Sequence, residues 1–547
     1  MLKSLRRSLR GDCIAGLTVW AVLVPEALAY ASIAGVSPVV GLYAAPGALI
    51  LYAVFGSSRQ LIVGPMAATA ALSAAAVGTL AAGNSGTFAA LTITLALTVG
   101  VIALVAGLLR LGFVANFISE PVLKGFIIGL ALTIIIGQVP KLFGIEKGEG
   151  NFFQQCWTVL SHLGHTQWRT LVVGLVSLAI VFGLRRWLPV VPAPLVAVIV
   201  GVLAVYALHL QKHGVKIVGH IDGGLPSFGF PAVPSGDYLK LAGPAVGVML
   251  VGFAEGLGAA KTYAAKNGYE ISPNSELIGL GAANVAAGLS SGMVVNGSLS
   301  KTAVNGSAGA RTQVSGLVVA ALTVITLLFL TGLFQDLPEA TLGAVVIAAL
   351  IELVDVSALR ALYRVQTSRL SRIYGPAARA DFIAAAAAML GVLIFDTLPG
   401  LFIGISMSLL LLVYRASRPH VAVLGRAPGN DQWTDKEHYP EDTTISGISV
   451  LRVESGLFFA NADFVREAVQ RAAKGKYAVI LDCETVPFVD VTAGRMLDEL
   501  TGHLREQGVR LVIAREIGQV RDVLAAAGPA PEYFPSVRAA MGVVRHG

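Results

Sequence analysis

The chain has 547 residues, of which 55% are hydrophobic and 13% charged, and its formal net charge is +7. Soluble domains carry roughly 25% charged residues, so this composition excludes an ordinary soluble enzyme, a disordered protein and a secreted disulfide scaffold. A surplus of Lys and Arg is typical of loops in membrane proteins, and no basic stripe interleaved with aromatic residues predicts nucleic-acid binding. The three cysteines lie far apart and form no CxxC pair, so we expect no metal and no other cofactor.

Long apolar segments dominate the first three quarters of the chain. A membrane-spanning helix needs roughly 20 mostly apolar residues. Twelve segments approach this length, and two shorter ones follow Gly64-Pro65 and Gly297-Ser298. The fourteen predicted segments are 12–33, 38–56, 65–80, 87–109, 117–139, 169–187, 192–210, 241–262, 274–289, 298–310, 313–333, 339–356, 380–398 and 400–416.

The loop charges predict the orientation in the membrane. If the N-terminus is cytoplasmic, Arg and Lys concentrate in the inner loops and are sparse in the two long outer loops, as the positive-inside rule requires. An even number of crossings returns the C-terminal region to the same side. We therefore expect a multi-pass protein of the plasma (inner) membrane with both ends cytoplasmic. The first apolar segment is expected to be a membrane helix rather than a cleaved signal.

The composition changes after Arg418. Residues 419–442 are polar and are expected to form a linker, which gives a membrane domain over 1–418 and a small soluble domain over 443–547. The soluble part alternates strand-like and helical patterns, so we expect a small α/β domain. Strands are predicted at 448–453, 456–460, 477–481 and 510–514, and helices at 462–473, 492–507 and 520–527.

The two short segments occupy equivalent places. Each is third in a set of seven, so the fourteen segments divide into a 7+7 repeat, and an odd number per repeat forces the second to be inverted. Interrupted helices at matching positions of two halves indicate a transporter's binding site. A half-helix that starts inside the membrane directs its free N–H groups and its positive dipole end at that point, which favours an anion. The alternative is a pair of ordinary short helices.

Charged residues inside apolar segments are the second indication, because they are costly there unless they are paired or hydrated. Glu26 lies in the first segment, Glu255 in the eighth, and Lys301 near the start of the second half-helix. Lys301 suits an anion, and either glutamate could carry a proton. The alternative is a purely structural pair between Lys301 and one glutamate. Tyr30, one turn after Glu26, and Met66, at the first half-helix, could line the site or simply pack.

Several motifs resemble the sulfate permease (SulP) family of anion transporters. The first group runs from Val24 to Ala31 and from Gly56 to Pro65, and the second includes Asn274-Ser275-Glu276-Leu277 and Gly297 to Asn305. The C-terminal part resembles the STAS domain that these transporters carry, through Gly456 to Ala462 and Val479 to Asp490. The resemblance covers nearly the whole chain.

The resemblance implies a fold with core and gate subdomains, a homodimer and an elevator-like movement. The anion would lie between the third and tenth helices. Carried over by position, the anion-binding residues are Glu26, Tyr30, Met66, Ser300, Lys301 and Thr302, and Glu255 matches the carboxylate that binds the coupling cation.

Three departures from the family pattern bear on the coupling ion and the anion. Glu26 stands where many relatives have Gln, and Lys301 stands where Arg is common, which removes a bidentate donor but keeps the charge. Sodium-dependent bicarbonate relatives have an acid and a Thr one turn apart in the eighth segment, whereas this chain has Glu255 and Ala259. The lost oxygen weakens a sodium site. These departures favour protons as the coupling ion.

Thr492 follows Asp490 where stand-alone STAS relatives carry a phosphorylated Ser or Thr. It is therefore a candidate regulatory site, and the alternative is that Thr492 only caps the following helix. The partners of the STAS domain stay open.

The expected function is secondary active transport of a small anion, most simply proton-coupled sulfate uptake, and not enzymatic catalysis. Bicarbonate or dicarboxylate transport coupled to sodium or protons, and a passive anion channel, remain as alternatives. A nucleobase permease would share the fold, but Lys301 and the STAS domain argue against it. A protein of another class, a membrane sensor that signals through STAS, also stays open.

Overall fold

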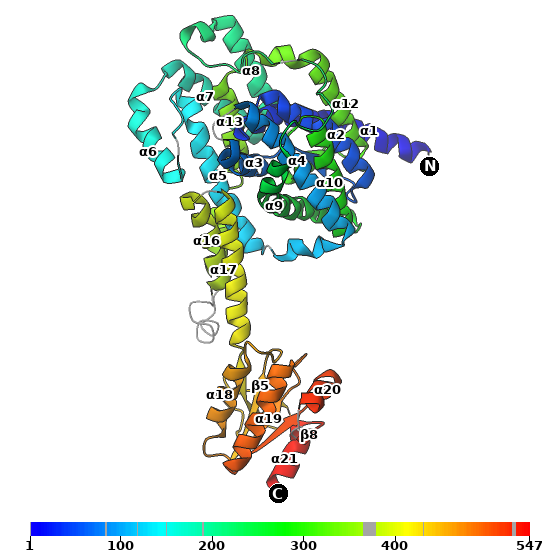
Figure 1. Ribbon diagram of the computed structural model, residues 1–547, viewed down its shortest axis with the longest axis vertical. Helices are drawn as coiled ribbons and strands as arrows, with labels where there is room; N and C mark the ends of the chain where they lie inside the picture. Colours follow the sequence, from blue (N-terminus) through cyan, green and yellow to red (C-terminus); the bar gives the residue numbers. More distant parts are fainter. Residues whose placement is uncertain are drawn as a thin grey trace. The chain divides into compact units, whose positions relative to one another are not determined.

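The computed structural model describes residues 2–81, 85–117, 119–148, 150–188, 191–221, 223–364, 379–395, 397–429, 432–527 and 532–546. Its contacts divide the chain into two compact units. The first comprises Met1–Tyr363 and Asp381–Met407, and the second comprises Arg364–Ala380 and Ser408–Gly547. Figure 1 shows the first as a bundle of helices and the second as a sheet with helices on its faces.

Each of the fourteen predicted segments coincides with a helix of the structure. The first seven are α1 (Leu2–Ile33), α2 (Pro38–Phe55), α3 (Ala67–Ala81), α4 (Ser85–Leu108), α5 (Glu120–Phe143), α7 (Trp168–Trp187) and α8 (Ala193–Leu208). The second seven are α9 (Ser235–Asn267), α10 (Pro273–Leu289), α11 (Leu299–Ser307), α12 (Val314–Ile325), α13 (Glu339–Ile351), α16 (Ala380–Phe395) and α17 (Thr397–Ser417). The fold class is therefore confirmed.

Two further helices lie between these segments, α6 (Phe152–His162) and α14 (Val356–Arg364), and a π-helical turn (Thr326–Leu330) extends α12. Short 3₁₀ turns occur at Leu111–Phe117, Leu163–His165, Leu210–His213 and Thr331–Phe334. Nine helices within the described ranges are long and apolar enough to cross a membrane. In lipid the backbone must satisfy its own hydrogen bonds, and helices do so within each segment.

Local signals fix several helix ends. Pro38 starts α2, where its missing N–H costs nothing, and the Ser272 hydroxyl accepts a hydrogen bond from Ser275 N (3.3 Å) at the start of α10. Gly144 and Gly268 end α5 and α9 with φ of 68°, a left-handed conformation that glycine adopts without a steric penalty.

Small residues allow helix α10 to lie close to α4. A Cβ added to Gly281 would stand 2.7 Å from Leu104 N, and one added to Gly288 would stand 2.5 Å from a Leu97 side-chain atom. Such close approach is how membrane helices gain packing energy, because lipid leaves no hydrophobic drive between them. The result is a dense block of helices behind the two half-helices α3 and α11.

The second unit is built on a six-stranded sheet in the order β4-β3-β5-β6-β7-β8. Strands β5 (Ile448–Val453), β6 (Ala478–Asp482), β7 (Arg510–Ala514) and β8 (Glu532–Phe534) are parallel, and β3 (Val421–Arg426) pairs antiparallel with both β5 and β4 (Trp433–Asp435). Helices α18 (Ala462–Ala473), α19 (Val491–Glu506) and α20 (Gly518–Ala527) pack on one face, and α21 (Val537–His546) packs on the other.

Two sequence expectations for the second unit differ from the structure. The expected strand at 456–460 is absent, because the Asn461 and Asp490 side chains accept hydrogen bonds from Phe458 N (3.0 Å) and Phe459 N (2.8 Å). The stretch 419–442, expected as a linker, contains β3 and β4. The polar composition of this stretch made them hard to predict, since β3 lies near the edge of the sheet and mixes buried with exposed residues.

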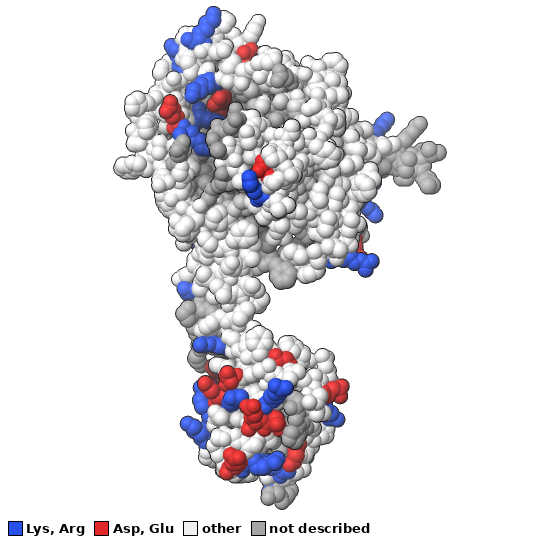
Figure 2. Space-filling model, in the orientation of Figure 1, with Lys and Arg blue, Asp and Glu red and all other residues white. Residues whose placement is uncertain are grey.

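Charge is distributed differently over the two units. Figure 2 shows Lys, Arg, Asp and Glu side chains crowded over the second unit, whereas the visible face of the first unit is mostly uncharged. A lipid-facing surface must be apolar, and a soluble domain need not be. The few charged side chains buried inside the first unit are therefore the candidates for a functional site.

Candidate functional site

A short strand precedes each half-helix, and the two strands pair with each other. Strand β1 (Ile62–Gly64) pairs antiparallel with β2 (Asn296–Ser298), with Ile62 opposite Ser298 and Gly64 opposite Asn296. Helix α3 begins three residues after β1, and α11 begins directly after β2. The ladder satisfies backbone groups that would otherwise be unpaired within the membrane, and it brings both helix N-termini to one place.

Side chains of α11 fix its position against β1. Ser298 caps α11 by accepting a hydrogen bond from Lys301 N (3.2 Å). The Thr302 hydroxyl accepts a hydrogen bond from Ile62 N (3.1 Å), and Asn305 Nδ2 donates to Gln60 O (2.9 Å). Thr302 and Asn305 are fully buried, so α11 is anchored to the strand of the other repeat.

The Lys301 side chain is the centre of the site and is 1% exposed. Its Nζ lies 2.7 Å from Glu26 Oε2, donates to Pro65 O at 3.2 Å, and lies 5.1 Å from the centroid of the Tyr30 ring. An ammonium over an aromatic face is attracted by the ring's quadrupole. The structure thus brings Glu26 and Tyr30 of α1 together with Lys301 of α11, beside the N-terminus of α3.

The other predicted anion-binding residues are placed less directly. Met66 follows Pro65 and is half-buried at the start of α3. Ser300 is exposed, and its hydroxyl lies 3.1 Å from that of Ser298. Thr302 faces β1 with its hydroxyl already engaged. The Pro65 carbonyl was not anticipated, because a backbone group leaves no signal in the sequence.

Glu255 of α9 faces a different part of the ladder. Its Oε2 accepts a hydrogen bond from Asn296 Nδ2 at 3.5 Å. Helix α9 can approach β2 because a Cβ at Gly256 would stand 3.0 Å from Asn296 Oδ1. Ala259, one turn beyond Glu255, is buried and offers no side-chain oxygen. The two glutamates therefore contact different groups: Glu26 forms an ion pair with Lys301, and Glu255 accepts a hydrogen bond from Asn296 of β2.

Two further buried carboxylates, which the sequence analysis did not single out, hold the segments beside the site. Glu276, fully buried in the first turn of α10, accepts hydrogen bonds from Tyr52 OH (2.7 Å), Ser57 N (2.8 Å), Ser57 Oγ (2.7 Å) and Ser58 N (3.0 Å). Asp12 accepts bonds from Arg311 N (2.7 Å), Thr312 N (3.1 Å) and Thr312 Oγ1 (2.7 Å). Glu276 belongs to a motif of the family resemblance, but its anchoring role could not be predicted, because an acidic residue in a first helical turn is common.

Metal ligands are not grouped in the parts of the chain that the structure describes: no three His, Cys, Asp or Glu residues there could hold an ion together. The chemistry available at the ladder is therefore one ammonium, two carboxylates and two helix N-termini. This arrangement can bind an anion and move a proton.

The position of Thr492 overturns the capping interpretation. The N-cap of α19 is Asp490, whose Oδ1 accepts a hydrogen bond from Ala493 N (2.8 Å) and whose Oδ2 accepts one from Phe459 N. Thr492 lies inside the first turn and is exposed. Aspartate is as good a cap as threonine, and here it stands one residue ahead of the helix. Thr492 remains a regulatory candidate without a capping role.

Comparisons with known proteins show the family of the chain and its C-terminal domain. The model of the sulfate permease family matches residues 9–373, and that of the STAS domain matches residues 439–540. A probable sulfate transporter of Mycobacterium tuberculosis is 39% identical over 526 residues, covering 95% of this chain and 92% of that protein. Sulfate transporter 1.3 of Arabidopsis thaliana is 34% identical over 538 residues, covering 92% and 79%.

Solved structures share the fold. The murine Solute Carrier 26 family member A9 anion transporter, in its inward-facing state, matches with a TM-score of 0.88 at 23% identity, covering 98% of this chain and 91% of that one. The transmembrane domain of the cyanobacterial bicarbonate transporter BicA matches with a TM-score of 0.61 at 23% identity, covering 70% and 97%. The chain is a multi-pass membrane transporter with a C-terminal STAS domain, and it belongs to the sulfate permease family.

Proposed function

We propose that this protein is a proton-coupled symporter of a small oxyanion, with sulfate as its substrate. The observation that carries the proposal is the buried pair between Lys301 Nζ and Glu26 Oε2, at 2.7 Å, where two half-helices begin. The Glu26 carboxylate lies where an anion would have to bind in order to contact Lys301 Nζ. A proton on Glu26 removes that competitor, so the anion and the proton bind together.

The charge at the site favours a divalent anion when Glu26 is protonated. Lys301 contributes one positive charge, and each helix N-terminus contributes about half a charge. Around Lys301, without Glu255, whose carboxylate faces Asn296 of β2, the sum is about +2 with Glu26 neutral and about +1 with Glu26 ionised. Sulfate matches the first state, and a monovalent anion such as bicarbonate matches the second. The names of two relatives, a probable sulfate transporter and a sulfate transporter, support the same substrate.

Glu26 is the proton carrier in this proposal, and Glu255 has a supporting role. Glu26 contacts Lys301 directly, whereas Glu255 accepts its hydrogen bond from Asn296 of β2. The absence of a side-chain oxygen at Ala259 argues against sodium, which needs several hard oxygen ligands. A passive channel would need no protonatable group beside its anion.

The remaining features of the proposal follow the family. We place the STAS domain and the N-terminus in the cytoplasm of a cell with the transporter in its plasma (inner) membrane, acting as a homodimer. In an elevator movement, the core subdomain, which contains the β1–β2 ladder, moves across the membrane relative to the gate subdomain. Since β3 belongs to the sheet, we place the start of the soluble domain near residue 419 rather than 443.

Uptake into proteoliposomes tests the proposal. Purified protein is reconstituted, and radioactive sulfate uptake is measured under an inward proton gradient, with and without sodium, with bicarbonate and fumarate as competitors. We expect uptake that depends on the proton gradient, does not require sodium, and is lost in Lys301→Ala. Uptake driven only by sodium, or uptake of bicarbonate without sulfate, would contradict the proposal.

A further inference from the structure

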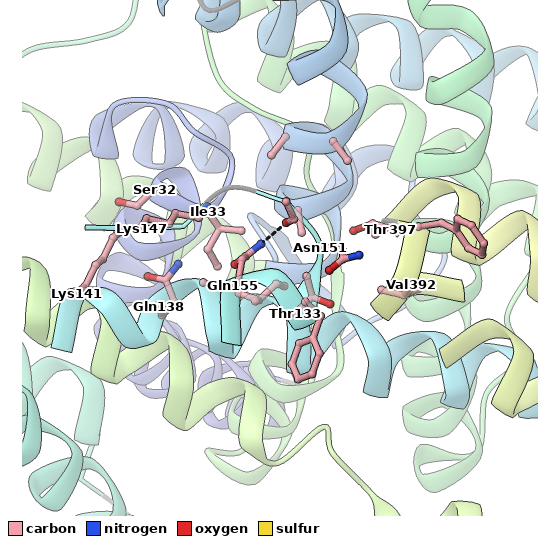
Figure 3. Close-up of a pocket in the computed structure, with 18 residues that line it drawn as sticks. Ser32, Ile33, Thr133, Gln138, Lys141, Lys147, Asn151, Gln155, Val392 and Thr397 are labelled. Atoms are coloured by element: carbon pink, nitrogen blue, oxygen red, sulfur yellow. Dashed lines mark hydrogen bonds between the residues drawn. The ribbon is translucent and has the colours of Figure 1, made fainter. Parts of the chain in front are cut away.

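A cavity of about 530 Å³, lined by both polar and apolar side chains, lies in the first unit, apart from the Lys301 site. Its walls come from the last turn of α1, from α3, from α5, from α6 and the segment before it, and from the ends of α16 and α17 (Figure 3). Ser32 stands two residues beyond Tyr30 on α1, and Ala71 stands one turn beyond the start of α3. The cavity and the Lys301 site therefore share two helices but no lining residue.

Two lysines are the charged residues among the described residues that line the cavity. Lys141, in the last turn of α5, and Lys147 line it, and Figure 3 shows both on the same side as Gln138. Neither lysine forms an ion pair within the described residues. Glu339 attracts Lys141 electrostatically but does not form an ion pair with it. No aspartate or glutamate is found among the described lining residues. Glu149 and Asp396, which adjoin lining residues in the sequence, lie outside the described part of the chain.

Neutral polar groups complete the lining. Gln138 is buried, and the Gln155 amide donates to Gly150 O (2.8 Å) while its Oε1 is buried without a hydrogen-bond partner among the described residues. A Cβ added to Gly137 would stand 3.4 Å from Gln155 Oε1 and 4.0 Å from Lys147 Nζ, so both groups converge over this glycine. A buried amide oxygen is an acceptor, so it needs a donor such as water. A water molecule between this oxygen and an anion held by the lysines would supply the missing hydrogen bond.

We propose that this cavity is a second oxyanion site, lined by Lys141, Lys147 and the amides of Gln138 and Gln155. Its role rests on the proposed transport function: it receives the anion on the access route along α3, at the face where α1 ends, and raises its local concentration before it reaches Lys301. Charged clefts concentrate counter-ions in this way. The alanines at 71, 74 and 75 leave room for a hydrated ion along α3.

Thiol chemistry tests the site without requiring transport. Ala75→Cys and Thr133→Cys, on different walls, are made in a Cys13→Ser/Cys156→Ser background, and their modification by anionic and cationic methanethiosulfonate reagents is timed. We expect Lys141→Gln/Lys147→Gln to lower the anionic-to-cationic rate ratio about fivefold or more. The matched control Lys212→Gln/Lys216→Gln, which alters two exposed lysines elsewhere, should leave the ratio unchanged. An unchanged ratio in the Lys141/Lys147 variant, or two unreactive cysteines, would overturn the proposal.

Protection by sulfate separates this site from the one at Lys301. At constant ionic strength, sulfate should slow the modification of Ala75→Cys more than gluconate does. The protection should persist in Lys301→Met/Glu26→Gln, which removes the first site without leaving an unpaired buried charge, and disappear in Lys141→Gln/Lys147→Gln. Loss of protection in Lys301→Met/Glu26→Gln would mean that no independent site exists. Failure of the proposed function would show separately, as wild-type proteoliposomes that accumulate no sulfate while the labelling results stand.

Discussion

Each of the two units buries a carboxylate against cations, but the arrangements differ. In the second unit, Asp482 is fully buried at the end of β6 and contacts both Arg452 (2.8 Å) and Arg515 (2.9 Å), and Glu484 contacts the same two arginines. In the first unit, Glu26 contacts Lys301 alone among cations of the described residues. A carboxylate held by two cations stays in place when one bond opens, whereas a one-to-one pair can exchange its partner. The first arrangement suits a structural tie and the second suits a transport site.

Removing Lys301 should have the largest effect. Lys301→Ala is expected to abolish anion binding and transport, and to destabilise the protein by about 3–5 kcal/mol, because it leaves the Glu26 charge buried and unpaired. Sulfate binding and thermal unfolding of the purified protein measure both effects. The matched control Lys301→Met/Glu26→Gln should recover stability but not binding. Full sulfate affinity in Lys301→Ala would place the anion elsewhere.

Loss of the Glu276 carboxylate is the next largest expected change. Glu276→Gln should cost about 2–3 kcal/mol, since an amide NH₂ replaces one of the oxygens that accept bonds from Tyr52, Ser57 and Ser58. The melting temperature and the transport rate should both fall, because the turn before β1 loses its anchor. Glu270→Gln, at an exposed carboxylate near the same helix, serves as the control and should behave as wild type. Equal melting temperatures in the two variants would remove the anchoring role.

In the second unit, substitutions of Asp490 and Thr492 should differ in their effect on stability, because only Asp490 caps α19. Asp490→Ala should cost about 1 kcal/mol, and Thr492→Ala should stay within about 0.5 kcal/mol. Hydrogen exchange of the first-turn amides of α19 in the full chain measures both. Faster exchange in Thr492→Ala than in Asp490→Ala would reverse the assignment of the cap.

The smallest effect concerns Cys483, at the end of β6. Burial raises the pKa of the Cys483 thiol, and the nearby Asp482 and Glu516 raise it further. A thiol that stays protonated reacts slowly, so iodoacetamide at pH 8 should leave Cys483 intact in the folded protein and modify it after unfolding in denaturant. Peptide mass analysis of the native protein gives the answer. Rapid modification of Cys483 would indicate that the end of β6 opens to solvent.

The sequence predicted the parts of the site that carry a composition signal. Hydropathy located the helices, the Gly-Pro and Gly-Ser breaks located α3 and α11, and charge within apolar segments singled out Glu26, Glu255 and Lys301. It could not predict which glutamate meets Lys301, because α1 and α9 are equivalent in the two repeats. Only the packing distinguishes them.

Other features were too short or too ordinary to be predicted. Strands β1 and β2 have three residues each, which is too few for a period of two to be recognised. The apolar run 456–460 has the composition of a strand, but side chains from Asn461 and Asp490 take up its N–H groups. Strand β3 was concealed by its polar surroundings, and its pairing with β5 is a long-range property of the sheet.

The most direct measurement of the central claim is the sulfate dissociation constant as a function of pH, in the wild type and in Glu26→Gln. If a proton on Glu26 releases Lys301, proton and sulfate binding are linked, and affinity in the wild type should rise as the pH falls, by up to about tenfold per unit. Glu26→Gln should bind sulfate tightly and independently of pH, and Glu255→Gln should keep the wild-type slope. A wild-type slope in Glu26→Gln that vanishes in Glu255→Gln would contradict the account.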